Sequence, residues 1–219
     1  MTSAQDGGSI DLAFSGPTRG ADRAVLLAHG AGADMNAVTL TAFSDALARQ
    51  KIPTMRFNFA YRAAGRGAPP KAPVLIDEVR RARDTLAKRC KLPASRIVLG
   101  GRSMGGRICS MAAADEDTLG LLLLGYPLHP PGKPEALRVD HFGALTMPVM
   151  FISGTRDTFG TPDEFTRHVK AIPGSVTQYW IETADHGFRP LKKQTGLTTE
   201  QALIPAAQAA ADWVVQLRS

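Results

Sequence analysis

The sequence predicts an α/β protein with a doubly wound, mostly parallel sheet of about seven strands and with helices on both faces. Short runs that are apolar throughout, such as VLLA at positions 25–28, alternate with longer segments of helical periodicity. Strands lose their in–out alternation when helices cover both faces of a parallel sheet. A third observation agrees with this fold: a glycine-rich turn, GGRSMGG at positions 100–106, joins a predicted strand to a predicted helix.

The short apolar runs are the candidate strands, and the longer periodic segments between them are the candidate helices. Strands are expected at residues 10–14, 24–28, 54–59, 97–100, 120–124, 149–153 and 177–181. Helices are expected at residues 36–50, 74–91, 104–114, 162–171 and 200–217. In the second of these helices, apolar residues from Val74 to Cys90 recur at helical spacing and form one stripe. Thr161 is the expected N-cap of the fourth helix, because Pro162 suits a first helical turn.

Two segments contain too much Gly and Pro for a regular element. Residues 61–73 also contain several arginines, and they predict a mobile basic loop. Residues 127–140 contain four prolines and one glycine, which predict a rigid, irregular excursion with room for one short helix. Both segments follow strands, and such loops meet at the edge of a parallel sheet where ligands bind. Both segments are therefore expected to form walls of a substrate site. Neither segment is long enough for a cap domain, so residues 1–219 are expected to form one domain.

The formal net charge is +6, and much of the excess lies on one predicted helix. The basic residues concerned are Arg80, Arg81, Arg83, Lys88, Arg89 and Lys91. No aromatic residues interleave with these charges, and no zinc-finger or helix-turn-helix pattern occurs. The cluster therefore predicts a solvated helix face, and no nucleic-acid partner is expected.

The remaining composition indicates an ordinary protein of the cytoplasm. Cys90 and Cys109 lie in separate predicted helices and are expected to be reduced thiols. No secretory leader is expected, and the longest apolar run, residues 119–124, is too short to span a bilayer. Neither a metal nor a nucleotide cofactor is expected, because no Cys/His/Asp cluster has ligand spacing and no Gly-x-Gly-x-x-Gly follows a strand.

Ser103 stands at the apex of the glycine-rich turn. A strand, a sharp turn of the form Gly-x-Ser-x-Gly and a helix together form the context of a nucleophile elbow. The serine backbone in such a turn is strained, and its neighbours must be small for the strand and helix to pack closely. Gly101, Gly105 and Gly106 meet that need. Ser103 is therefore the candidate nucleophile.

A serine hydroxyl is a weak nucleophile at neutral pH, so a base must take its proton, and histidine suits this role. His186 follows the last predicted strand. His29 ends the second strand, His168 lies within a helical pattern, and His129 and His141 flank the proline-rich segment. Only His186 combines a strand-end position with the right order in the chain, and it is the candidate base.

The base in turn needs a carboxylate that holds its tautomer and stabilises the imidazolium. Asp157 leaves the penultimate predicted strand through a glycine turn and is the candidate acid. Asp185 is the rival, but it is adjacent to His186 in sequence, so its side chain is expected to point away from the imidazole. Asp163 and Glu164 are expected to be first-turn helix acids that the helix dipole favours.

A tetrahedral oxyanion needs two preorganised N–H donors. One is expected from the Met104 amide, directly after the nucleophile. The other is expected from the segment HGAG at positions 29–32, where small residues let the backbone approach a substrate. Within it the Ala31 amide is favoured, with Gly32 as its near neighbour.

Three residues are candidate lining of the substrate pocket: Gly32, Arg102 and Tyr126. Arg102 is beside the nucleophile, where it reaches a substrate carboxylate or pairs with a surface acid. Tyr126 follows the strand that is expected next to the elbow strand.

These residues resemble those of the α/β-hydrolases without a cap domain, and especially the dienelactone-hydrolase-like and small carboxylesterase group. The order Ser103, Asp157, His186 is that of the α/β-hydrolases. Dienelactone hydrolase has a cysteine in place of Ser103, so its particular substrate is not implied. Five sequence segments resemble those of a narrower branch, which is shared with testis-expressed and NSL-complex regulatory proteins. These segments are HGAGAD at 29–34, RFNF at 56–59, GGRSMGGR at 100–107, GYPLHP at 125–130 and ISGTRD at 152–157. The resemblance to this branch also implies roles as complex subunits.

The expected function is a serine hydrolase that cleaves an ester or related acyl bond of a small molecule through an acyl-enzyme. One alternative is an interaction subunit with a vestigial catalytic site and with helix 74–91 as its docking face. Another is a thioesterase or peptidase with the same three residues, because these activities differ in leaving-group fit. The sequence leaves the substrate and the oligomeric state open.

Overall fold

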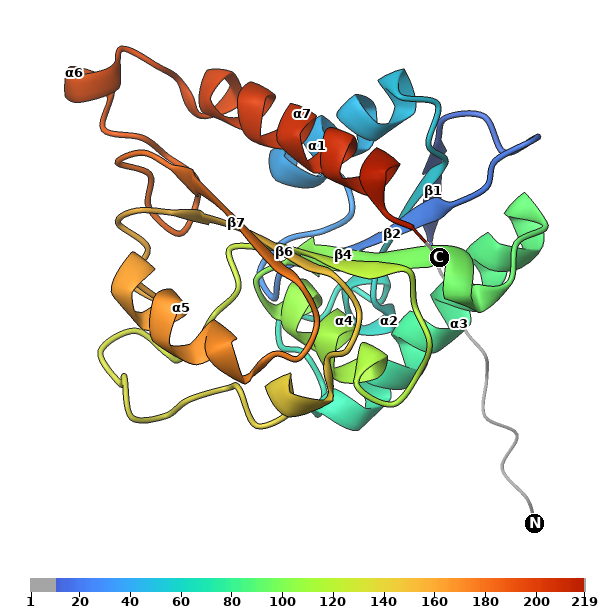
Figure 1. The fold of residues 1–219 in the computed structure, drawn as a ribbon, viewed down its shortest axis with the longest axis horizontal. Coiled ribbons are helices and arrows are strands. Elements are labelled where there is room, and N and C mark those ends of the chain that lie inside the picture. Colours follow the sequence, from blue (N-terminus) through green and yellow to red (C-terminus); the bar gives the residue numbers. More distant parts are fainter. Residues whose placement is uncertain (1–10, 219) are drawn as a thin grey trace.

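The computed structural model describes residues 11–218 and contains one seven-stranded sheet between two layers of helices (Figure 1). The strand order is β1-β3-β2-β4-β5-β6-β7; β1 is antiparallel to β3, and every other pair is parallel. This confirms the predicted doubly wound sheet. The strands are β1 (Leu12–Ser15), β2 (Ala24–Ala28), β3 (Thr54–Phe57), β4 (Ile97–Arg102), β5 (Gly120–Leu124), β6 (Val149–Gly154) and β7 (Val176–Ile181). Position 10 of the first predicted strand lies outside the described residues.

Helices cover both faces of the sheet (Figure 1). One layer holds α1 (Val38–Arg49) and α7 (Thr199–Gln216), and the other holds α3 (Ala72–Cys90), α4 (Met104–Ala113) and α5 (Pro162–His168). The short elements are α2 (Ala60–Ala63), α6 (Lys192–Thr195) and three 3-10 turns at Ala94–Arg96, Phe142–Ala144 and Val169–Ala171. At α5 the Thr161 hydroxyl accepts from the Glu164 amide while the Glu164 side chain accepts from the Thr161 amide, so the predicted N-cap is confirmed.

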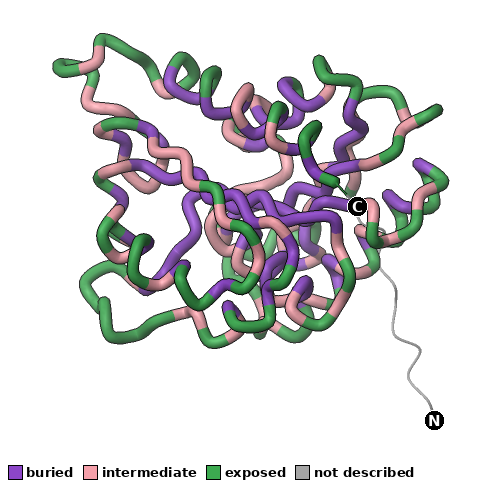
Figure 2. The backbone as a smooth tube through the Cα atoms, in the orientation of Figure 1, coloured by how far each residue is buried: buried purple, intermediate pink, exposed green. Residues whose placement is uncertain are grey.

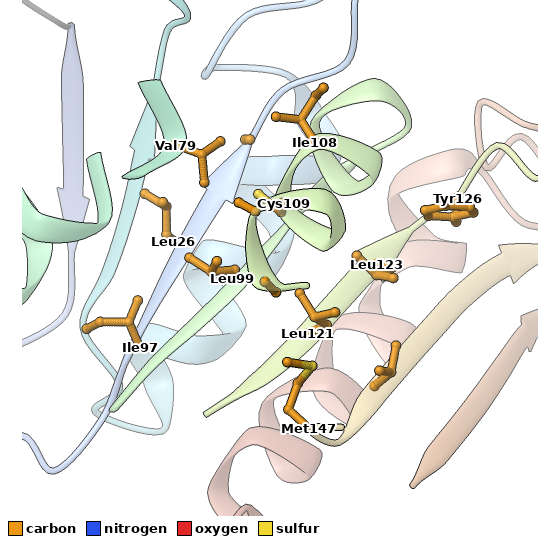
Figure 3. Close-up of a cluster of buried hydrophobic side chains, with 14 of the residues drawn as sticks. Leu26, Val79, Ile97, Leu99, Ile108, Cys109, Leu121, Leu123, Tyr126 and Met147 are labelled. Carbon is orange, nitrogen blue, oxygen red and sulfur yellow. The ribbon is translucent and has the colours of Figure 1, made fainter. Parts of the chain in front are cut away.

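The core has two halves because the central strands bury both of their faces. Leu26 of β2 packs with the cluster under α3 and α4, whereas its neighbour Leu27 packs with the cluster under α1 and α7. The buried parts of the chain accordingly run through the middle of the sheet (Figure 2). Figure 3 shows the first cluster, which contains Cys109 of α4 together with Leu99 and Leu121 of the strands. Both cysteines are free and buried.

Two segments differ from their predictions. Residues 61–73 are not a mobile loop throughout, because Tyr61 is buried within α2 and Pro73 lies in the first turn of α3. The Gly, Pro and Arg content of this segment predicted a loop, although Tyr61 at its start packs into the core. Residues 127–140 are irregular as predicted but contain no helix; the short helical turn comes just after them, at Phe142–Ala144.

The basic face of α3 is partly neutralised. Arg80 Nε lies 2.6 Å from a carboxylate oxygen of Glu116, which follows α4. Arg83 pairs with the other oxygen of Glu116 and with Asp84. Two of the six basic residues named for this helix are therefore paired with acids of the molecule. None of the described helices is long and apolar enough to cross a membrane.

His141 makes folding sensitive to acid. Its Nε2 lies 2.8 Å from Oγ of Ser110. Burial, together with the Arg107 cation, lowers its pKa from 6.5 to about 4. As the pH falls from about 6.5 towards 4, the unfolded chain binds a proton that the folded protein resists, so the free energy of unfolding falls.

We therefore expect His141→Gln to lose less stability than the wild type between pH 7 and pH 4.5. Urea unfolding of both proteins at several pH values measures this difference. Parallel pH dependences of the two proteins would contradict the assignment.

Candidate active site

The turn from β4 into α4 holds Ser103 in a strained conformation. Its φ is 51° and its ψ is −116°, which a non-glycine residue rarely adopts. The strain follows from close packing, because α4 starts directly against the end of β2. A Cβ at Gly105 would lie 2.4 Å from the Ala28 carbonyl oxygen, and one at Gly101 would lie equally close to it. The predicted need for small residues around Ser103 is thus confirmed.

The structure brings three sequence-distant side chains into one hydrogen-bonded line. Ser103 Oγ lies 3.0 Å from Nε2 of His186, and Nδ1 of His186 lies 2.8 Å from Oδ2 of Asp157. A carboxylate only accepts, so Nδ1 carries the proton and Nε2 presents its lone pair to the serine. This is the arrangement in which an imidazole takes a proton from a hydroxyl.

Asp157 is held rigidly, whereas the rival Asp185 is engaged elsewhere. The Asp157 side chain is 1% exposed, and its Oδ1 accepts from the Phe159 amide at 2.8 Å. The carboxylate of Asp185 accepts from two backbone amides of its own turn and pairs with Arg189 at 3.1 Å. The carboxylate that contacts His186 is therefore that of Asp157.

An aromatic residue that the sequence analysis did not single out fixes the imidazole plane. The Phe159 ring stacks on the His186 ring with centroids 4.0 Å apart and an interplanar angle of 26°. Its signal in the sequence is weak, since it only follows Asp157 by two positions. It covers one face of the imidazole, so that the ring edge points from the carboxylate to the serine.

The loop after β2 presents the Ala31 amide to the same site. Ala31 lines the pocket at Ser103, and within residues 11–218 its N–H has no hydrogen-bond acceptor. The carbonyl oxygen of the same peptide unit, that of Gly30, accepts from the Ala33 amide at 3.1 Å and from His29 Nδ1 at 2.8 Å. Because the peptide is planar and trans, these bonds aim the Ala31 N–H the opposite way.

Met104 is the other residue placed to donate its amide. It is the first residue of α4, and the first amides of a helix lack partners within the helix. The positive end of the α4 dipole adds to the field at this point. Neither the Ala31 amide nor the Met104 amide has an acceptor in the described part of the chain, so both are free to donate beside the serine.

His29 is buried and bridges two strand ends. Its Nε2 accepts from the Phe59 amide at 3.1 Å while Nδ1 donates to Gly30, which requires the neutral ring. Burial accordingly lowers its pKa.

We expect His29→Ala to lower kcat for a phenyl ester about tenfold with a smaller change in KM, since the Ala31 peptide loses a support but keeps its N–H. Steady-state kinetics of His29→Ala and of a control variant, His168→Ala on α5, measure this loss of kcat. Equal losses in the two variants would contradict the role of His29.

A shallow, open pocket of about 350 Å3 lies in front of the serine. It is lined by Gly30, Ala31, Gly32, Ala33, Ala37, Thr39, Arg102, Ser103 and His186. Gly32 and Arg102 therefore lie where the sequence analysis expected them. Ala37, which is the N-cap of α1, and Thr39 in its first turn were not expected there.

The expectation for Tyr126 and for the two loop walls is wrong. Tyr126 is fully buried within the first core cluster (Figure 3). Its ring meets the Phe142 ring at a tilt and the Phe151 ring edge-on, and its hydroxyl donates to the Arg138 carbonyl. It turns into the core because the strand β5 before it is buried on both faces. Neither residues 61–73 nor residues 127–140 line the pocket, whose wall comes from the loop after β2.

This pocket lies where the strand order reverses. From β2 the chain builds the sheet outward to β3, then returns to place β4 on the other side of β2. The loops after β2 and β4 therefore diverge and leave a crevice at the carboxyl ends of the strands. Ala31 and Ser103 face each other across it because of this topology.

Comparison with known families agrees with the geometry. Residues 21–215 match the family described as the alpha/beta hydrolase domain. The chain belongs to the α/β-hydrolase family. As expected for members without a cap, the described part of this α/β-hydrolase contains no separate cap domain. No group of three His, Cys, Asp or Glu residues is placed to hold a metal ion within residues 11–218.

Solved structures similar to this α/β-hydrolase include serine hydrolases and a protein with ferulic acid bound. Est1E from Butyrivibrio proteoclasticus, solved with ferulic acid bound, has a TM-score of 0.76 and 14% identity over 97% of this chain and 96% of that one. An alpha-beta serine hydrolase homologue from Coxiella burnetii has a TM-score of 0.69 and 17% identity over 93% of this chain and 90% of that one. A serine hydrolase without lid from Xanthomonas campestris has a TM-score of 0.67 and 18% identity over 96% of this chain and 90% of that one. At these identities the likeness shows the fold.

Proposed function

We propose that this α/β-hydrolase is a serine hydrolase that cleaves an ester or related acyl bond through an acyl-enzyme. The observation that carries the proposal is the hydrogen-bonded line from Ser103 through His186 to the buried Asp157, which opens into a pocket. The two unpaired amides of Ala31 and Met104 support it, since they provide donors for an oxyanion.

In the proposed reaction, Ser103 Oγ attacks the substrate carbonyl while its proton passes to Nε2 of His186. Asp157 holds the tautomer and stabilises the resulting imidazolium. The carbonyl oxygen becomes an oxyanion between the Ala31 and Met104 amides. The bond to the leaving group then breaks as Nε2 protonates it, and water repeats the cycle on the acyl-enzyme.

The open pocket favours small or extended acyl groups. A series of 4-nitrophenyl esters from acetate to dodecanoate tests this preference by kcat/KM. The short esters are expected to be turned over at least as well as the long ones, because the pocket is open and no large apolar side chain lines it. Activity confined to the long chains would contradict the proposal.

We infer that ester cleavage is favoured over the role of an interaction subunit, which the resemblance to the testis-expressed and NSL-complex branch also suggests. A vestigial site has no need to keep an acid, base and nucleophile in hydrogen-bonding register. The docking face on α3 is also weakened by the pairing of Arg80 and Arg83 with Glu116. A folded protein that turns over no neutral phenyl ester would favour the subunit role. Thioester or amide cleavage uses the same residues and is tested with matched thioester and anilide substrates.

The proposed setting is the cytoplasm, with a small acyl compound as substrate. The two buried, unpaired thiols of Cys90 and Cys109 support a reducing compartment. Burial raises the pKa of Cys109 to about 12, so this thiol is inert.

A further inference from the structure

The Arg102 side chain contacts His186, the candidate base. Its stem passes Gly30, and its guanidinium lies against Gly125 and over the Phe188 ring, with Cζ 4.9 Å from the ring centroid. From there Nη1 is 3.1 Å from Nε2 of His186, and Nη2 donates to the His186 backbone carbonyl. The side chain also lines the pocket in front of Ser103.

The guanidinium competes with the serine for the base. Nε2 of His186 has a single lone pair, because Nδ1 carries the proton that Asp157 accepts. Ser103 Oγ at 3.0 Å and Arg102 Nη1 at 3.1 Å both reach that lone pair. Burial lowers the pKa of Arg102 to about 10, against the pull of Asp157 and Asp185, so it stays a cation and only donates at neutral pH.

Proton transfer makes this contact unfavourable. Once Nε2 has taken the serine proton, it is a donor on an imidazolium and faces another donor on a cation. The guanidinium therefore needs a different acceptor during turnover. None of the ion pairs within residues 11–218 includes Arg102, although its side chain is half-buried. A half-buried cation without an anionic partner loses hydration that no counter-charge replaces.

We propose that Arg102 binds a carboxylate on the leaving group of the substrate, an inference that rests on the proposed serine hydrolase function. The planar fork of the guanidinium matches a carboxylate in two parallel hydrogen bonds. Binding turns Nη1 away from Nε2 and leaves the lone pair to Ser103. The anion belongs to the leaving side, because Nε2 delivers its proton to the leaving oxygen and Nη1 lies beside Nε2. The substrate class is then an ester of a hydroxy acid whose hydroxyl is acylated.

A pair of matched substrates tests the proposal: 3-acetoxybenzoate and its neutral methyl ester. In the wild type, kcat/KM is expected to be about 10- to 100-fold higher for the anion, as one or two charge-assisted hydrogen bonds imply. In Arg102→Met this ratio is expected to fall to about one or below. Turnover of the methyl ester is expected to rise in the same variant, because the competing donor at Nε2 is gone. Arg102→Lys keeps the charge without the fork and is expected to keep only part of the preference; it carries the comparison if Arg102→Met does not fold.

A binding measurement separates this inference from catalysis. Calorimetry on Ser103→Ala is expected to show 3-hydroxybenzoate binding at least about tenfold more tightly than methyl 3-hydroxybenzoate, and equal binding in Ser103→Ala/Arg102→Met. Anion binding through Arg102 without turnover of either ester by the wild type would overturn the proposed function alone. Turnover of both esters with no preference, or with a preference that survives Arg102→Met, would overturn the role of Arg102 alone.

Discussion

Replacing Ser103 with alanine is expected to lower kcat for a phenyl ester by about 10⁴-fold or more, because no other hydroxyl takes its place in the line to His186. The stability should change little, since the strained backbone is kept by the glycines around it rather than by the hydroxyl. Initial rates on 4-nitrophenyl acetate, with urea unfolding of the same samples, measure both effects.

The matched control for this loss is Ser95→Ala. Ser95 is exposed in the 3-10 turn before β4 and lies at the opposite end of that strand from the elbow. It is expected to keep wild-type turnover. If Ser103→Ala retained more than about a hundredth of the wild-type kcat, a nucleophile other than Ser103 would have to be found.

Replacing Gly105 with alanine is expected to lower the free energy of unfolding by about 2–3 kcal/mol. The new Cβ would lie 2.4 Å from the Ala28 carbonyl oxygen and 2.5 Å from that of His29, and neither backbone atom can rotate away. Helix α4 must therefore move off β2. Since α4 carries the Met104 amide and β2 leads to the Ala31 amide, kcat should fall as well. Urea unfolding and ester kinetics measure the two effects.

Gly67→Ala is the control that separates crowding from the loss of a glycine. A Cβ at Gly67 meets nothing within 4 Å, and its backbone is not in the left-handed region. Alanine there is expected to be neutral or slightly stabilising, since it restricts the unfolded chain. Equal unfolding midpoints for Gly105→Ala and the wild type would contradict the close packing of α4 on β2.

Much of this site could be predicted from the sequence because parallel sheets constrain where loops lie. Ser103, Asp157 and His186 each follow a parallel strand, and the carboxyl ends of parallel strands share one edge. Their order in the chain then leaves few assignments. The glycine spacing around Ser103 is similarly informative, since only close backbone contact requires so many residues without a Cβ.

The parts that failed depend on which way a side chain turns. Tyr126 follows a strand end just as Asp157 does, yet it rotates into the core and bonds the Arg138 carbonyl. The stacking of Phe159 on His186, like the reach of Arg102 to Nε2, involves side-chain directions in turns and at a strand end. No periodicity in the sequence encodes those directions.

The proposed function requires Ser103 to be an activated nucleophile. Intact-mass spectrometry after exposure to a fluorophosphonate, followed by peptide mapping, tests it most directly. The wild type is expected to gain one adduct on the peptide that carries Ser103, Ser103→Ala none, and Asp157→Asn an adduct that forms far more slowly. A folded wild-type protein that stays unmodified, or an adduct that persists in Ser103→Ala, would contradict the account.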